Sequence, residues 1–162
     1  MTALMTPQQN KDRAGVIAPP PLIYLGGILI ALALDRWWCG CPIFTLTGWR
    51  WSGFVLIVAG VSLAITGRRA MLAAETNINP FKPTMSIVSS GPFRFTRNPL
   101  YLALTLIYAG LTLVLNTWWC VVLLAPVLLL IHFGVVAREE RYLERKFGES
   151  YRQYRARVRR YL

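Results

Sequence analysis

Long apolar blocks alternate with polar and basic segments along this chain. The longest uncharged block, residues 98–137, is bounded by Arg97 and by Arg138-Glu139-Glu140. A helix needs about 20 apolar residues to cross a bilayer, so this block suits two crossings joined by a tight turn at Asn116-Thr117. Such a hairpin returns the chain to the side it left. We therefore expect the polar residues at its two ends to meet at one membrane surface, where they form a candidate active site.

The pattern as a whole predicts an all-α, polytopic membrane protein that forms a single domain over residues 1–162. Four transmembrane helices are expected, followed by a cytoplasmic C-terminal amphipathic helical segment. The expected spans are about 22–38, 49–67, 99–115 and 118–137. Because 49–67 and 99–115 are short for a crossing, we expect helix tilt or local thinning of the bilayer to accommodate them.

Two segments outside the spans have patterns of their own. Residues 68–97 contain several turn formers and helix breakers, which predicts a long loop lying against the headgroup region. After the fourth span, apolar side chains recur at helical spacing, with a break predicted at Gly148. This apolar face consists of Leu143, Phe147, Tyr151, Tyr154 and Val158. The opposite face is rich in arginine, which suits an anionic membrane surface or a simple membrane anchor.

The charge distribution predicts the orientation of the chain in the membrane. The sequence has 18 Lys and Arg against 7 Asp and Glu, a net charge of +11. Because the basic residues flank apolar spans, the expected counter-charge is anionic lipid and not nucleic acid. Apart from Arg36 and Arg50, they lie in the middle loop, the C-terminal tail or the N-terminal tail with Lys11 and Arg13. The positive-inside rule then places both termini in the cytoplasm, with the six tryptophans and three cysteines near the opposite face.

No metal site is expected from the cysteines. Cys39-Gly-Cys41 has neither the redox spacing C-x-x-C nor the spacing of a usual zinc pair, and Cys120 is far away in sequence. A disulfide remains open for Cys39 and Cys41, as does a role as small residues at the membrane boundary. The chain also lacks a phosphate-binding glycine-rich loop and a G-x-S-x-G nucleophile motif.

The segment Arg97-Asn98-Pro99 has a structural and a functional interpretation. Asn98 suits the N-cap of a helix and Pro99 its first turn, with Arg97 reaching to lipid phosphate. The same helix N-terminus offers free N–H groups and a partial positive charge to a carboxylate or phosphate on a ligand. Both interpretations remain open on the residues alone.

Glu139, Glu140 and His132 are the other candidates. Neighbouring glutamates point about 100° apart on a helix, so one can face the hairpin, where a buried carboxylate needs a cationic partner. The alternative is a solvated charge cluster that stabilises the helix. Glu140 and Glu144 are four residues apart and carry the same charge, which makes this alternative less convincing. His132 lies within the fourth span, either as a functional intramembrane group or as a neutral histidine hydrogen-bonded between helices.

Two motifs resemble a known family. Residues 87–101, IVSSGPFRFTRNPLY, look like the L-V-x-x-G-P-[YF]-x-x-x-R-H-P-x-Y stretch of isoprenylcysteine carboxyl methyltransferases and are similar to related phospholipid methyltransferases. Residues 139–151, EERYLERKFGESY, resemble the E-E-x-x-L-x-x-x-F-G-x-x-Y signature of the same family. The two motifs lie either side of a membrane hairpin, as in that family, and the resemblance covers residues 87–162.

The resemblance implies an integral membrane enzyme that uses S-adenosylmethionine. The methyl acceptor would be a membrane lipid or another lipophilic or small molecule, reached at the cytoplasmic face. The implied catalytic residues are Arg97, Asn98 and Tyr101. The implied cofactor-binding residues are Gly91, Phe93, Arg97, Asn98, Pro99, Tyr101, Glu139 and Glu140.

Asn98 departs from the family pattern, which has a histidine at this position. Asparagine forms hydrogen bonds but does not titrate near neutral pH. It can therefore replace a histidine that hydrogen-bonds the cofactor. A histidine that acts as a base would need another group in its place, or an acceptor that needs no base.

Methyl transfer suits the residues available, because it depends on positioning and exclusion of water and needs no metal. The alternative from a different class is a non-enzymatic small membrane protein, such as a transporter subunit or a scaffold. His132 would then be the mid-membrane ionisable residue that transport usually needs. The acceptor atom (O, N or S) and the oligomeric state are left open.

Overall fold

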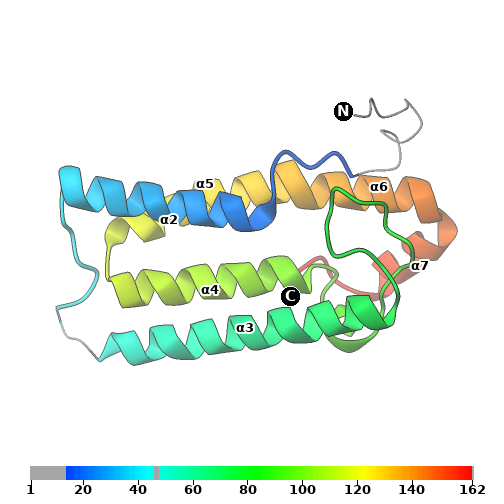
Figure 1. The fold of residues 1–162 in the computed structure, drawn as a ribbon, viewed down its shortest axis with the longest axis horizontal. Helices are drawn as coiled ribbons and strands as arrows, with labels where there is room; N and C mark the ends of the chain where they lie inside the picture. The colour runs from blue at the N-terminus through cyan, green and yellow to red at the C-terminus, as the bar shows by residue number, and fades with distance from the viewer. Residues whose placement is uncertain (1–13, 46–47, 162) are drawn as a thin grey trace, which may run out of the picture.

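Helices make up the regular structure of this protein (Figure 1). The computed structural model describes residues 14–45 and 48–161. In chain order the helices are α2 (Pro20–Trp37), α3 (Trp49–Ala73), η1 (Gly91–Arg94), α4 (Pro99–Leu115), α5 (Trp118–Ile131), η2 (His132–Val136), α6 (Ala137–Phe147) and α7 (Glu149–Arg157). The predicted all-α class is confirmed for this part of the chain. Lys11 and Arg13, predicted to belong to the basic side, lie outside the described residues.

The long helices run side by side, with consecutive helices antiparallel (Figure 1). Helix α2 packs against α5, and α3 packs closely along α4. Helix α5, the π-helical turn η2 and α6 follow one another without a break, so they form one long rod. The connection between α3 and α4 lies at the same end of the bundle as α6 and α7, opposite the α4–α5 turn (Figure 1).

Within the described residues, three helical stretches are long and apolar enough to cross a membrane. They are Pro20–Trp37, Trp49–Ala73 and Trp118–Phe147. The fourth predicted span coincides with α4, which is apolar but has 17 residues, and its crossing stays a prediction. Helix α3 continues past the predicted boundary at residue 67. Arg68 and Arg69 mark the edge of an apolar span, but arginine has a high helix propensity and does not end the helix. The predicted loop 68–97 therefore begins at residue 74.

A row of glycines allows α3 to approach α4 closely. Gly53, Gly60 and Gly67 recur every seven residues, which keeps them on one face, and all three are buried. A β-carbon on Gly60 would lie 2.7 Å from Cγ1 of Ile107 and 2.8 Å from the backbone oxygen of Ala103. Small residues let helix backbones meet in a membrane, where helix association depends on van der Waals packing. This contact positions the start of α4.

The α4–α5 turn is fixed at the place predicted for the hairpin. Asn116 adopts the left-handed conformation with a φ of 56°. Its side-chain oxygen accepts from the N–H groups of Ile43 and Phe44, and its amide donates to the carbonyl of Phe44. In the same α2–α3 connection Cys39 and Cys41 form a disulfide, the pairing that the sequence left open.

The rod of α5 and α6 changes its winding at residues 132–136. This segment is π-helical, so each turn holds more residues than an α-helical turn. The carbonyl of Gly134 accepts the N–H of Ile17 at 3.2 Å, and a β-carbon on Gly134 would collide with the Ile17 side chain. The segment that precedes α2 is therefore packed directly against the π-helical turn.

The helix break predicted at Gly148 is confirmed, and this residue has a φ of 52° between α6 and α7. The predicted apolar face is wrong at its last member. Helix α7 ends at Arg157, and Val158 is extended. The chain after α7 is thereby free to turn back toward the bundle.

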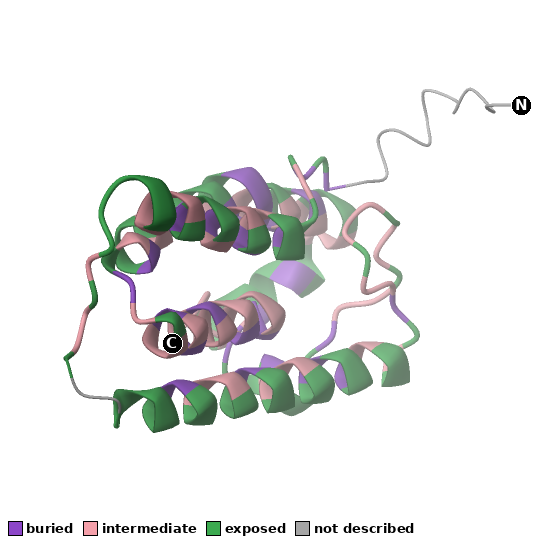
Figure 2. Cartoon of the chain, turned by 60° about the vertical axis from the view of Figure 1, so that its left-hand side comes forward, coloured by how far each residue is buried: buried purple, intermediate pink, exposed green. Residues whose placement is uncertain are grey.

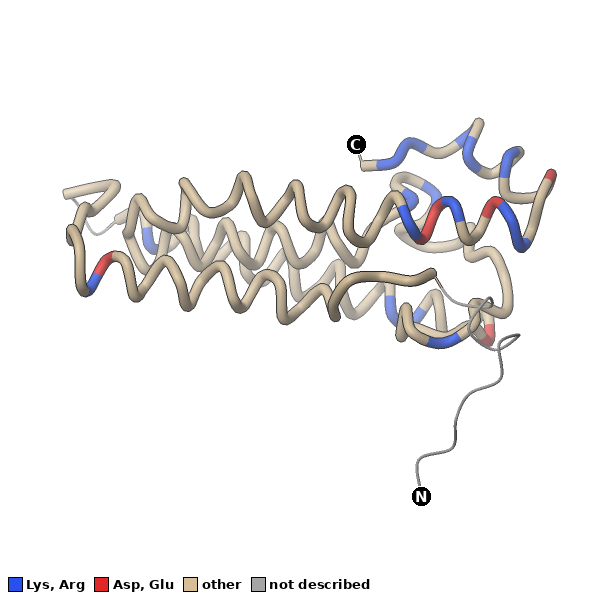
Figure 3. Tube along the Cα trace, turned by 90° about the horizontal axis from the view of Figure 1, so that it is seen from above, with Lys and Arg blue, Asp and Glu red and all other residues tan. Residues whose placement is uncertain are grey.

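Charges gather at one end of the bundle (Figure 3). This end holds the basic residues of α6 and α7 and of the last turns of α3. The opposite end holds the last turn of α2, with Asp35 and Arg36, and the first turn of α3, with Arg50. Between the two ends, the outward faces of the helices are largely exposed (Figure 2). The large apolar side chains exposed there include Leu29, Val58 and Leu129. An apolar exterior of this kind suits contact with lipid.

The glycine row predicts a contrast between two alanine substitutions. Gly60→Ala is expected to lower the thermal unfolding midpoint of the purified protein in detergent, since overpacking against backbone costs about 1–3 kcal/mol. Gly26→Ala in α2 is the matched control, because no atom lies within 4 Å of a β-carbon there. It is expected to leave the midpoint unchanged or slightly raised. Equal midpoints for the two variants would contradict close packing of α3 on α4.

Candidate functional site

A cavity of about 120 Å³ lies at the charged end of the bundle. Its walls come mainly from two parts of the chain that are far apart in sequence: the end of α3 with the α3–α4 connection and the start of α4, and α6 with α7. Its polar wall includes Arg97, Asn98, Tyr101, Glu139 and Glu140. Its apolar wall includes Met71, Ile78, Val88, Phe93 and Leu100. The cavity can therefore accommodate a molecule that has both charged and apolar parts.

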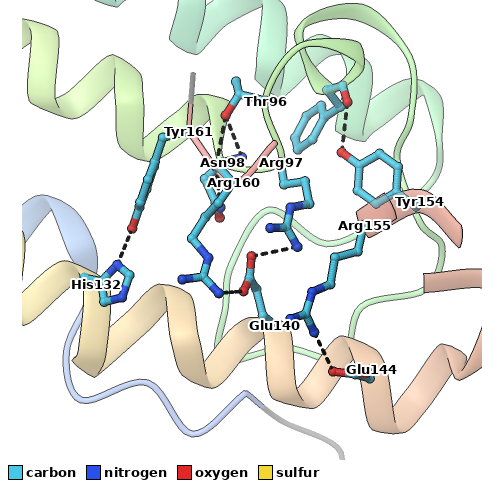
Figure 4. Close-up of polar contacts among 11 residues, drawn as sticks. Thr96, Arg97, Asn98, His132, Glu140, Glu144, Tyr154, Arg155, Arg160 and Tyr161 are labelled. Atoms are coloured by element: carbon cyan, nitrogen blue, oxygen red, sulfur yellow. Dashed lines mark hydrogen bonds and ion pairs between the residues drawn. The ribbon is translucent and has the colours of Figure 1, made fainter. Parts of the chain in front are cut away.

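Glu140 is the charge centre of this site (Figure 4). Its Oε1 lies 3.1 Å from Nη1 of Arg97, and its Oε2 lies 2.6 Å from Nη2 of Arg160. The Glu140 side chain is 7% exposed and the Arg97 side chain 9%, against 34% for Arg160. Taking a carboxylate out of water is costly unless cations are close to it. The two guanidinium groups explain how Glu140 is accommodated at this depth.

Several buried polar atoms around Glu140 have no hydrogen-bond partner in the described part of the chain. They are Nε and Nη1 of Arg97, Oε1 of Glu140 and Nε of Arg160. The 3.1 Å contact between Arg97 and Glu140 is therefore an ion pair whose angles do not meet those of a hydrogen bond. Buried polar atoms are nearly always hydrogen-bonded, so exceptions call for an explanation. Arg97 and Glu140 both line the cavity, so these polar side chains border the space that a bound molecule would occupy.

Tyr101 and Glu139 form a second polar pair in the cavity wall. Tyr101 lies in the first turn of α4 and Glu139 on α6, and both line the cavity. The interpretation as a solvated cluster is wrong for Glu140, which is buried and paired with two arginines. That description fits Glu144, one turn further along α6, which pairs with Arg155 at the surface at 3.1 Å.

The last residues of the chain run beside the start of α4. The N–H of Arg97 donates to the carbonyl of Arg159 at 2.9 Å. The side chains of Thr96 and Asn98 both donate to the carbonyl of Arg160, at 3.1 and 3.0 Å (Figure 4). Asn98 occupies the predicted N-cap position, but its side chain makes no capping hydrogen bond. Its amide group instead binds the backbone of Arg160.

His132 lies outside the cavity lining. Its Nδ1 is 2.9 Å from the hydroxyl of Tyr161 (Figure 4). The expectation of a hydrogen-bonded histidine thus holds in part, because the partner belongs to the chain end and not to another helix. The π-helical turn that contains His132 is a feature often found at functional sites.

Helix α7 contributes two buried tyrosines to the cavity wall, Tyr151 and Tyr154. The Tyr154 hydroxyl donates to the backbone carbonyl of Phe93 at 2.9 Å, which holds η1 against α7. Burial raises the pKa of both phenols to about 12. Both are therefore protonated at neutral pH and can donate hydrogen bonds.

The structure brings together the residues predicted from sequence, with one exception. The cavity is lined by Phe93, Arg97, Asn98, Pro99, Tyr101, Glu139 and Glu140. Gly91 does not line it; this glycine begins η1 with a φ of 57° and serves to turn the chain. The roles of all these residues in binding or catalysis stay predictions.

Sequence reasoning missed three tyrosines in the cavity wall and one arginine beside it. Tyr151 and Tyr154 belonged to the predicted apolar face, and Tyr151 also ends the second motif, so their burial was foreseeable and a place in the cavity was signalled for Tyr151 alone. Tyr142 had no signal, and nothing in the pattern distinguishes Arg160 from its neighbours in the basic tail. Among the described residues, no group of three or more His, Cys, Asp and Glu could hold a metal ion.

The charge centre predicts unequal effects for two glutamates of α6. Glu140→Ala leaves the guanidinium groups of Arg97 and Arg160 facing each other without an anion, and we expect it to destabilise the protein by about 3–5 kcal/mol. Glu144→Ala is the matched control, because removing an exposed ion pair costs about 0–1 kcal/mol. Thermal unfolding of both variants in detergent checks the contrast, and a Glu140→Ala midpoint equal to that of Glu144→Ala would disprove it.

Comparison with known proteins identifies the family. The family described as phospholipid methyltransferase matches residues 49–150. A protein of Haemophilus influenzae described as uncharacterized is 44% identical over 66 residues, which cover 39% of this chain and 100% of that protein. No solved structure matches this chain. The family match includes α3, α4, α5 and α6, and so most of the cavity wall. The chain therefore belongs to the phospholipid methyltransferase family.

Proposed function

We propose that this protein transfers a methyl group from S-adenosylmethionine to a lipophilic or small-molecule acceptor at the cytoplasmic face of a membrane. Membership of the phospholipid methyltransferase family suggests such an enzyme. The observation that carries the proposal is the buried ion pair of Arg97 and Glu140 in the wall of an amphiphilic cavity, where atoms of both side chains lack a hydrogen-bond partner. This arrangement supports binding of a ligand that carries both an anionic and a cationic group.

The donor set suits the amino-acid end of S-adenosylmethionine. Nε and Nη1 of Arg97 would bind its carboxylate, and Oε1 of Glu140 would bind its ammonium group. Glu139 and Tyr101 would bind hydroxyl or cationic groups of the cofactor. Phe93, with the other apolar side chains of the wall, would exclude water from the reacting centre. These assignments use the residues predicted from the sequence.

When bound, S-adenosylmethionine supplies an electrophilic methyl group on a positively charged sulfur. The protein then needs to position the acceptor in line with that methyl and keep water out. Asn98 does not serve as a base in this proposal, because its amide is bound to Arg160 and does not titrate. Glu139 is the better candidate for accepting a proton, because Glu140 already neutralises two arginines.

The membrane arrangement follows from where the charges lie. In the proposal the whole chain forms one domain in which α4 is a fourth crossing, since its 17 residues are apolar and pack along the full-length span α3. The basic end faces the cytoplasm together with both termini. A lipophilic acceptor reaches the cavity from the bilayer, and the cofactor enters from the cytoplasm.

Cofactor binding by Arg97 predicts a selective loss of affinity. The wild-type protein in detergent is expected to bind S-adenosylmethionine in a calorimetric titration. Arg97→Met is expected to weaken binding about tenfold or more, the effect of losing a hydrogen bond to a charged group, and it leaves Glu140 paired with Arg160. Arg94→Met is the matched control, since Arg94 is exposed and does not line the cavity. Absence of binding by the wild type would refute the proposed function.

The proposed role of Glu139 predicts a defect in methyl transfer. Membranes that contain the protein are expected to incorporate label from methyl-labelled S-adenosylmethionine into a lipid or metabolite fraction, and the labelled product identifies the acceptor. Glu139→Gln keeps the size of the side chain but cannot accept a proton, so we expect a fall in initial rate of about 10²-fold. Glu144→Gln, on the surface of the same helix, is expected to retain the wild-type rate. Equal rates for the two variants would remove Glu139 from the mechanism.

A further inference from the structure

The C-terminal segment, residues 158–161, is attached to the site at both of its ends. At one end, the backbones of Thr96 and Arg159 form a parallel bridge, and the N–H of Arg97 donates to the carbonyl of Arg159 at 2.9 Å. At the other end, the Tyr161 hydroxyl lies 2.9 Å from Nδ1 of His132. The segment therefore spans from the start of α4 to the π-helical turn of the rod.

Arg160 lies between these two attachments and holds one oxygen of Glu140. Its Nη2 is 2.6 Å from Oε2, whereas Oε1 faces Arg97. Each carboxylate oxygen thus has its own guanidinium group, which fixes the rotation of the carboxylate. Arg160 is absent from the cavity lining and its side chain is 34% exposed, whereas its partner Glu140 lines the cavity, so this ion pair is the contact that connects Arg160 with a bound molecule.

Asn98 accounts for the position of Arg160. Its buried amide donates to the Arg160 carbonyl at 3.0 Å, and the Thr96 hydroxyl donates to the same oxygen at 3.1 Å. Two donors on one carbonyl fix the backbone from which the Arg160 side chain extends. A residue in the motif that opens α4 is thereby connected to Glu140 on α6 by way of the chain end.

We infer that the C-terminal segment is a working part of the site, in which Asn98 holds the backbone of Arg160 and Arg160 positions the Glu140 carboxylate for a bound ligand. This inference rests on the proposed function, since the ligand in question is S-adenosylmethionine. It makes Asn98 and Arg160 positioning residues. Asn98 would then act on the ligand through the chain end and Glu140, and not through proton transfer.

Equilibrium binding of S-adenosylmethionine to the full-length protein in detergent tests the role of Arg160. Arg160→Met is expected to weaken affinity about tenfold, and Arg160→Lys, which keeps the charge, to recover part of that loss. Arg157→Met is the matched control, because Arg157 is exposed at the end of α7 and its Nε bonds the carbonyl of Gln153 in its own helix. It is expected to bind within twofold of the wild type. If Arg160→Met does not fold, Arg160→Gln takes its place with the same expectation.

A double-mutant cycle separates positioning from general stabilisation. If Arg160 acts through Glu140, the variant that combines Glu140→Gln with Arg160→Met should bind as weakly as Glu140→Gln alone, within about twofold. A purely structural role would instead lower the unfolding temperature without changing the affinity of the folded protein. Losses that add in the double variant would overturn the inference.

The role of Asn98 has its own test. Asn98→Asp keeps the shape of the side chain but places an acceptor against the carbonyl of Arg160, so we expect about fivefold weaker binding, the effect of losing one hydrogen bond. Wild-type affinity in Asn98→Asp would overturn this part of the inference. The failures are distinguishable. A wild-type protein that does not bind S-adenosylmethionine refutes the proposed function. A binding wild type with an equally tight Arg160→Met refutes the further inference alone.

Discussion

The buried carboxylate of Glu140 joins three parts of the chain that are distant in sequence. It belongs to α6, and its two oxygens face Arg97 before α4 and Arg160 after α7. At low dielectric such charges cannot separate without a large cost. The hairpin of α4 and α5 brings the start of α4 and α6 to the same end of the bundle, and this charge centre then fixes how they face each other. The cavity is lined by side chains from the start of α4 and from α6, so its shape depends on the position of these two helices.

Where a single residue determined the local structure, the sequence predicted the fold closely. Pro99 marks the start of α4, Asn116 the turn after it and Gly148 the break after α6, and all three are found where they were expected. The meeting of the two polar ends followed from the hairpin alone. The end of α3 was placed too early, because a pair of arginines limits a span but not a helix.

The remaining parts of the site depend on contacts that no local pattern encodes. Arg160 is one of many arginines in the C-terminal tail, and it pairs with Glu140 because α7 stops at Arg157 and the chain turns back. Asn98 occupies the expected N-cap position, yet its side chain has a partner more than sixty residues away. Gly91 belongs to the matching motif but serves the backbone of η1. A motif therefore identified which residues gather, and not what each of them contacts.

The π-helical turn has a consequence for how such a protein can change during evolution. Each residue advances an α-helix by about 100°, so the winding of residues 132–136 sets the direction in which Glu139 and Glu140 leave the rod relative to α5. Gly134 and Ile17 fit together at this turn and preserve its shape. An insertion or deletion of one residue here would redirect both carboxylates while leaving the apolar length of α5 intact. The length of this turn therefore sets the rotation of the α6 carboxylates about the rod relative to α5. A change of one residue in the turn would alter that rotation without changing α5 itself.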